Sequence, residues 1–164
     1  MGYRYFDKVA ATPLAEFGKG LSYSTFSFTN LTVAPTTDST PNPNAATKNN
    51  NPTPNPNAAT KNTVDRVTVS LTLTNTGATM AAAEVVQLYI SFPASYGEPV
   101  RPLRGFRKVK LNPGQSEVIN LTLSDRDLSV FHPEGMQWVR ASGQFHVFVG
   151  SSSRNLPLSG SFTL

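Results

Sequence analysis

The sequence contains no cysteine among its 164 residues. Disulfide bonds, thiolate zinc sites and cysteine nucleophiles are therefore excluded, while the redox compartment stays undetermined. Long apolar runs are also missing, so we predict no segment that crosses a membrane. Charged residues make up only 15% of the chain, and its formal net charge is +4. Because this charge is small and spread along the chain, we do not expect nucleic acid as a partner.

The first twenty residues lack the apolar core that a secretion signal needs. We interpret residues 1–20 as a linker from an absent upstream domain, and Met1 as the start of a fragment. Hydrophobic residues are 38% of the chain, which is enough for one core. We therefore predict a single domain over residues 21–164.

The stretch from Pro35 to Thr63 differs from the rest of the chain because it contains no Val, Ile, Leu, Met or aromatic residue. The sequence TPNPNAATKN occurs in it twice, at 40–49 and at 53–62. Without apolar side chains to bury, such a segment cannot offset the conformational entropy lost on ordering. We interpret residues 35–63 as a flexible insertion, since two such repeats also cannot stack into a solenoid.

Outside this stretch, apolar and polar residues alternate with a period of two, as in strands with one buried and one wet face. Runs of this kind, or short apolar runs, cover 26–31, 67–74, 83–92, 109–111, 118–123, 145–149 and 160–164. Turn residues such as Asn112-Pro113-Gly114 separate them, and no stretch has a convincing helical period. We predict an all-β fold, an antiparallel β-sandwich of about seven strands.

Arrangements that carry catalysis are hard to find in this sequence. Paired-carboxylate hydrolysis requires two acidic side chains that face each other, but Asp125, Asp127 and Glu134 fall where turn or capping residues are usual. The two histidines, His132 and His146, have no second close ligand, and no nucleophile elbow is present. We therefore predict no catalytic residue, no metal site and no cofactor.

Five cationic residues fall within ten positions: Arg101, Arg104, Arg107, Lys108 and Lys110. With Phe106 among them, they could form a surface that binds lignin or polysaccharide through charge and stacking. The alternative is an edge strand whose positive charges prevent sheet-to-sheet aggregation. Tyr96, in the loop before this cluster, is a further candidate to stack on a sugar ring.

Two N-glycosylation sequons occur, Asn30-Leu31-Thr32 and Asn120-Leu121-Thr122. Both lie in predicted strands, with their asparagine side chains on the outer face. They are compatible with a secreted eukaryotic protein without establishing one.

A series of short motifs runs through the chain outside the Pro35–Thr63 stretch. They are EFGKGLSYSTF at 16–26, VSLTLTNTG at 69–77, AEVVQLYI at 83–90, RPLRGFRK at 101–108 and LNPGQS at 111–116. In this order they resemble the C-terminal fibronectin type III-like domain of family 3 glycoside hydrolases, the β-glucosidases and β-xylosidases. GYRYFDK at 2–8 is similar to the linker that leaves the preceding α/β domain of such enzymes.

The resemblance implies a fibronectin type III or immunoglobulin-like sandwich. It also implies that the catalytic carboxylates lie in other domains of a parent enzyme that acts in carbohydrate metabolism. The chain would then be a non-catalytic accessory domain that stabilises a secreted β-glucosidase-like enzyme by packing on its catalytic domains. Phe17, Tyr23 and Phe26 would be core or interface residues rather than a sugar platform.

Overall fold

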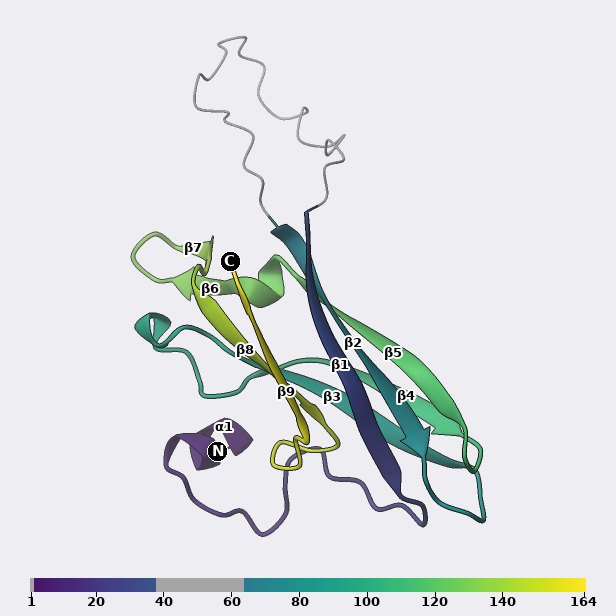
Figure 1. Ribbon diagram of the computed structural model, residues 1–164. Coiled ribbons are helices and arrows are strands. Elements are labelled where there is room, and N and C mark those ends of the chain that lie inside the picture. Colours follow the sequence, from purple (N-terminus) through teal and green to yellow (C-terminus); the bar gives the residue numbers. More distant parts are fainter. Residues whose placement is uncertain (1, 38–63) are drawn as a thin grey trace.

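The computed structural model describes residues 2–37 and 64–164 (Figure 1). Within these ranges there are nine strands, one short α-helix and two 3₁₀ turns. The helix is α1 (Tyr3–Lys8), and the 3₁₀ turns are η1 (Ala94–Tyr96) and η2 (Arg126–Leu128). The strands are β1 (Phe26–Thr37), β2 (Val64–Asn75), β3 (Ala82–Ser91), β4 (Leu103–Leu111), β5 (Ser116–Ser124), β6 (Ser129–His132), β7 (Gln137–Arg140), β8 (Gln144–Gly150) and β9 (Leu158–Thr163).

Seven of these strands form two antiparallel sheets, which confirms the predicted all-β sandwich. One sheet has three strands in the order β1-β2-β5, and the other has four in the order β4-β3-β8-β9. In Figure 1 the two sheets lie against each other, and their strands run along the length of the domain. No helix in residues 2–37 or 64–164 has both the length and the apolar character to cross a membrane.

The core lies between the sheets and is filled by the apolar positions of the alternating runs. These side chains are at most 8% exposed: Val67, Val69, Leu71, Leu73, Val86, Leu88, Ile90, Ile119, Leu121, Leu123, Phe145, Val147 and Val149. The rings of Phe145 and Phe162 stack in parallel with their centroids 5.0 Å apart. Period-two patterning therefore identified the inner faces, because each strand turns one row of side chains into the core.

The outer edge strands β4 and β5 lie on the same side of the sandwich. There the Nη2 atom of Arg107 lies 2.7 Å from the Oε1 atom of Glu117, and the pair joins the two sheets. Both side chains are partly exposed, so we assign the pair a small contribution to stability.

Three details differ from the sequence-based predictions. A two-stranded hairpin, β6-β7, is added to the seven predicted strands, and its four-residue strands are too short to show a period. The helix α1 forms within the predicted linker, where the sequence shows no convincing helical period. Strand β1 continues to Thr37, so the predicted start of the insertion at Pro35 is wrong, and residues 38–63 lie outside the described residues.

Candidate functional site: the exposed apolar face of the N-terminal segment

The N-terminal segment, residues 2–24, covers part of the outer face of the four-stranded sheet. On β3, Gln87 and Tyr89 alternate with core residues and should face solvent, yet they are only 3% and 0% exposed. They are buried because this segment packs over them, with α1 below β8 and β9 in Figure 1. The domain therefore has a third layer beside its two sheets.

Hydrogen bonds to Gln87 join this layer to the sheet. The Nε2 atom of Gln87 donates to the carbonyl oxygens of Gly18 (2.9 Å) and Ser151 (2.7 Å). Its Oε1 atom accepts a hydrogen bond of 2.6 Å from the Tyr89 hydroxyl. Burial raises the pKa of Tyr89 far above its ordinary value, so the hydroxyl stays a donor. The buried amide of Gln87 thus has partners for both its oxygen and its nitrogen.

Aromatic contacts hold the start of the segment. The Tyr3 ring stacks on Phe17 with a centroid distance of 4.6 Å and meets Tyr89 edge-on at 5.9 Å. The Tyr3 hydroxyl also accepts a hydrogen bond of 2.7 Å from the backbone N–H of Leu103. These contacts fix α1 against the sheet although the helix has only six residues.

A buried ionic cluster completes the attachment. The Asp7 side chain is 2% exposed, and its Oδ1 atom lies 3.1 Å from Nε of Arg154 and 3.8 Å from Nη2 of Arg101. Arg154 also donates from Nη2 to the carbonyl oxygen of Ala11 at 2.9 Å. The two guanidinium groups compensate the charge of the buried carboxylate.

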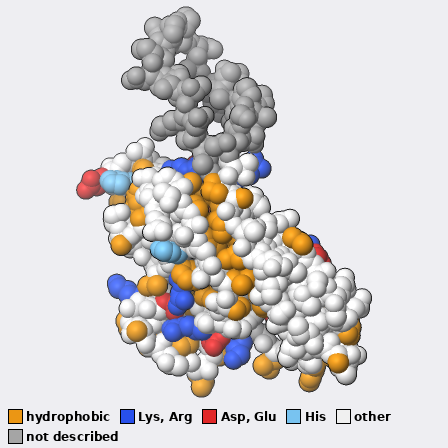
Figure 2. Space-filling view, in the orientation of Figure 1, with side chains coloured by type: hydrophobic (Ala, Val, Ile, Leu, Met, Phe, Trp, Pro, Cys, Tyr) orange, Lys and Arg blue, Asp and Glu red, His pale blue; other side chains and the backbone are white. Residues whose placement is uncertain are grey.

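The segment also presents apolar side chains to solvent. We call this set the docking face: Tyr5, Val9, Leu14, Phe17, Leu21 and Tyr23. Leu14, Leu21 and Tyr23 are 107%, 99% and 96% exposed, so they make almost no contact within the chain. In Figure 2 hydrophobic side chains protrude along the lower margin of the domain, where this segment runs. An apolar group of this size on an ordered segment is typical of an interface.

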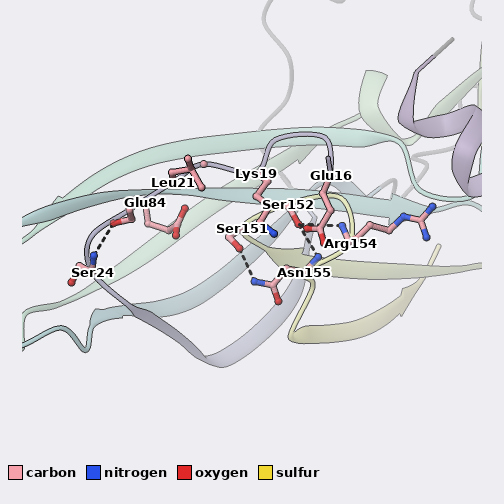
Figure 3. A pocket seen from close by; sticks show the side chains of 11 residues that line it. Glu16, Lys19, Leu21, Ser24, Glu84, Ser151, Ser152, Arg154 and Asn155 are labelled. Carbon is pink, nitrogen blue, oxygen red and sulfur yellow. Dashed lines mark hydrogen bonds between the residues drawn. The ribbon is translucent and has the colours of Figure 1, made fainter. Parts of the chain in front are cut away.

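A polar cleft of about 510 Å³ opens beside the docking face (Figure 3). Residues 16–24 form one wall, and Glu84 with residues 151–155 forms the other. Glu16 accepts a hydrogen bond of 2.5 Å from the Ser152 hydroxyl, and Asn155 donates to the Ser151 hydroxyl at 2.8 Å. Burial raises the pKa of Glu84. Carboxylates, hydroxyls and cations share the lining, and neither histidine belongs to it, so it suits hydrogen bonding to polar groups of a partner.

Comparisons with known proteins agree with this architecture. Residues 84–153 match the Fn3-like family, described as the fibronectin type III-like domain. Probable β-glucosidase D of Aspergillus flavus is 42% identical over 164 residues, covering 100% of this chain and 21% of the relative. Probable β-glucosidase M of Neosartorya fischeri is 44% identical, covering 99% of this chain and 20% of the relative.

Solved structures contain the same fold. A β-D-glucoside glucohydrolase from Trichoderma reesei superposes with a TM-score of 0.78 and 36% identity, covering 98% of this chain and 22% of that one. The family 3 β-glucosidase of Bifidobacterium adolescentis superposes with a TM-score of 0.79 and 31% identity. The match covers 100% of this chain and 20% of that one. The chain is thus similar to a fibronectin type III-like domain and to part of a family 3 β-glucosidase. It spans about a fifth of the length of the relatives that it matches.

Three of the five cations predicted as a polymer-binding surface are held by contacts within the domain. Arg101 pairs with Asp7, and its guanidinium lies 5.7 Å from the centroid of the Phe148 ring. Arg104 is half-buried over Phe92, and the burial lowers its pKa. Arg107 pairs with Glu117 in the other sheet.

The remaining members of that cluster face outward together. Phe106, Lys108 and Lys110 alternate with core-facing residues on β4, and all three side chains are exposed. Tyr96, the further candidate to stack on a sugar ring, is half-buried, and its ring packs against the core. Its hydroxyl forms a hydrogen bond of 3.4 Å with the Ser142 hydroxyl and accepts one of 2.9 Å from the Ser142 N–H, and both bonds lower its pKa.

The aromatic residues of the 16–26 motif divide between the core and the surface. Phe26 packs against the core, whereas Phe17 and Tyr23 belong to the docking face. Sequence reasoning missed Asp7, Gln87 and Arg154, which attach the segment. The one signal in the sequence was Gln87, an amide inside the apolar run 85–90.

Proposed function

We propose that this fibronectin type III-like domain is a non-catalytic accessory domain of a β-glucosidase-like glycoside hydrolase. It stabilises the enzyme by packing its docking face on the catalytic domains of the same chain. The observation that carries the proposal is the pairing of two properties in residues 2–24. The segment is anchored by buried contacts on its inner side, and it exposes large apolar side chains on its outer side.

The length of the relatives supports this proposal. About four fifths of each matched β-glucosidase lies outside the region that this chain covers, and that remainder is a ready partner for an apolar surface. Burial of Leu14, Leu21 and Tyr23 would remove apolar surface from water. Each side chain would contribute about 1.5–3 kcal/mol to the stability of the contact. The polar cleft would accept hydrogen-bonding groups at the rim of the same contact.

A chimera tests the docking role. This chain replaces the matching segment of the Trichoderma reesei enzyme, and its thermal unfolding is compared with that of a Leu14→Ser/Leu21→Ser/Tyr23→Ser chimera. We expect the triple variant to melt at least about 3 °C lower. In the isolated chain the same substitutions should leave the melting temperature nearly unchanged, because these side chains touch almost nothing there.

The matched control is Phe106→Ser/Met136→Ser, which removes two exposed apolar side chains outside the docking face, 68% and 78% exposed. We expect this variant to leave the chimera's melting temperature unaltered. Equal losses in both variants, or none in the triple variant, would refute the docking role. The isolated chain should not hydrolyse aryl β-glucosides; turnover abolished by a single Asp or Glu substitution would contradict a non-catalytic role.

A second candidate function is binding of lignin or polysaccharide, which the outward row Phe106, Lys108 and Lys110 favours. Adsorption of the chain to lignin, cellulose and xylan is measured at two salt concentrations. If this row binds, Phe106→Ala/Lys108→Ala/Lys110→Ala reduces adsorption, and salt weakens its charged part. No adsorption to any of the three polymers would exclude this function.

A further inference from the structure

The outer face of the three-stranded sheet is polar along its register, unlike the docking face. Its neighbouring rows across β1, β2 and β5 are Ser27-Thr74-Ser116, Thr29-Thr72-Val118, Thr32-Ser70-Asn120 and Ala34-Thr68-Thr122. Among the described residues, Val118 is the one large exposed hydrophobic side chain on this face, at 60%. Such a surface gives no apolar reason for a protein partner to cover it.

Asn30 protrudes from this face at a β-bulge in β1. Thr29 pairs with Thr72 and Thr32 pairs with Ser70, so two residues of β1 oppose one of β2. Leu31 packs toward the core, and Asn30 is the inserted, exposed residue with a φ of +54°. Its amide makes one long hydrogen bond, 3.4 Å from Nδ2 to the Thr72 hydroxyl. The left-handed conformation explains an asparagine at this position but does not explain the threonine two residues later.

Asn120 lies on the same face in the edge strand β5. Its side chain is exposed, and its Oδ1 atom accepts a hydrogen bond of 2.6 Å from the Ser70 hydroxyl. Within the described part of the chain the Nδ2 atom has no hydrogen-bond partner. Because the bond from Ser70 fixes the oxygen, the nitrogen faces solvent. Thr122, two residues on, projects from the same face and is exposed.

We propose that this face is a glycan-bearing surface with N-linked oligosaccharides on Asn30 and Asn120, and that the domain follows a secretory route. In both sequons the asparagine and the threonine at the third position are exposed residues. The two asparagines flank the central strand β2, so they lie on the order of 10 Å apart across the sheet. Two glycans at this spacing cover the polar face and protect the edge of β5 from pairing with another sheet.

The modification is a transfer from a polyprenyl-diphosphate oligosaccharide. The amide nitrogen forms a C–N bond to the anomeric carbon, the C–O bond to diphosphate breaks, and the amide loses one proton. Each asparagine keeps its oxygen and one N–H. The hydrogen bond from Ser70 to Asn120 therefore persists after modification, and the bulge at Asn30 is not disturbed.

Mass spectrometry of the full chain, secreted from a yeast host behind an added signal peptide, tests the proposal. Peptide-N-glycosidase converts each glycosylated asparagine to aspartate, so the expected result is this conversion at both positions. Thr32→Ala should abolish it at position 30 only, and Thr122→Ala at position 120 only. These variants leave both asparagines, and the left-handed conformation at Asn30, in place.

Thr32→Ser and Thr122→Ser are the matched controls, since serine keeps the hydroxyl, and both sites should stay occupied. A secreted chain with neither asparagine converted overturns the proposal. Conversion at one position alone overturns the assignment of the other. The result does not depend on docking, because the assay needs no catalytic domain.

Discussion

The Asp7 carboxylate lies 3.1 Å from the Nε atom of Arg154, so that an ion pair joins the first helix to the loop between β8 and β9. The Asp7 oxygens are buried and make no hydrogen bond of good geometry within the described residues. The carboxylate therefore depends on the charges of Arg154 and Arg101. Because the same segment bears the docking face on its outer side, this ion pair links the stability of the domain to its proposed interface.

Asp7→Asn should destabilise the domain by about 2–3 kcal/mol. Removing one partner of a fully buried ion pair costs about 3–5 kcal/mol, and the guanidinium groups here are partly exposed, which reduces the loss. Urea unfolding followed by circular dichroism measures it. Glu117→Gln breaks the exposed pair with Arg107 and should cost less than about 1 kcal/mol. Equal losses in the two variants would contradict a special role for Asp7.

Tyr89→Phe should cost about 1–2 kcal/mol, because it leaves the buried Oε1 atom of Gln87 without its donor. The segment that Gln87 holds should also become more mobile. Hydrogen exchange measured by mass spectrometry would then be faster over residues 3–18 than in the parent domain. Tyr96→Phe is the control, since that hydroxyl bonds the exposed Ser142 rather than Gln87. Unchanged exchange in Tyr89→Phe would show that Gln87 does not depend on this donor.

The sandwich was predictable because the alternation of buried and exposed residues is visible within the sequence of each strand. Val67, Val69, Leu71 and Leu73 alternate with hydroxyl residues, and this local period requires no knowledge of the partner sheet. The same reasoning misplaces Gln87 and Tyr89. A period of two assigns them to the solvent side, and only a third layer contributed from far away in the sequence buries them.

The docking face could not be deduced from residues 2–24 alone. Leu14 and Leu21 belong to no periodic run, and the helix α1 has six residues without an apolar stripe. What orders the segment is a set of tertiary contacts, such as Tyr3 on Phe17 and Asp7 on Arg154. The cluster around Arg101 shows a different limit of the sequence. Its members are close in sequence and suggested one surface, but in the structure they contact different partners.

The Glu84 carboxyl predicts a pH dependence of stability. Burial raises its pKa in the folded state, so the folded domain binds more protons than the unfolded chain between the two pKa values. Stability therefore decreases as pH rises through this window, and the penalty persists at neutral pH. Glu84→Gln should raise the free energy of unfolding at pH 7, since its amide oxygen can still accept the bond from the Val85 N–H.

The advantage of Glu84→Gln should vanish below the unfolded pKa of the glutamate, about 4.3. Urea unfolding at pH 7 and at pH 3.5 measures both values. Glu134→Gln, at an exposed turn, is the control. It should leave the free energy of unfolding unchanged at both pH values. If the two pH values gave the same difference for Glu84→Gln, burial of the charge would not be its cause.

Asn75→Asp tests the most fully hydrogen-bonded polar side chain in the core. Asn75 is 0% exposed, and its Nδ2 atom donates to the carbonyl oxygens of Met80 (3.2 Å) and Leu111 (3.0 Å). Its Oδ1 atom accepts from the N–H of Gly77 at 3.0 Å and from the Ser24 hydroxyl at 2.5 Å. An aspartate keeps the shape but turns a negative oxygen toward two carbonyls. We expect a loss of about 3 kcal/mol or more at pH 7.

The loss in Asn75→Asp should shrink as pH falls. The buried carboxyl can donate only when protonated, so its folded pKa lies above the unfolded value of about 3.9. The variant then regains stability relative to the parent domain as pH drops through that raised pKa. Asn120→Asp is the matched control: in a bacterial product without glycans it should be nearly neutral, because there the amide oxygen is engaged and the nitrogen faces solvent. Similar losses in both variants would contradict the assigned role of the Asn75 nitrogen in joining Met80 and Leu111.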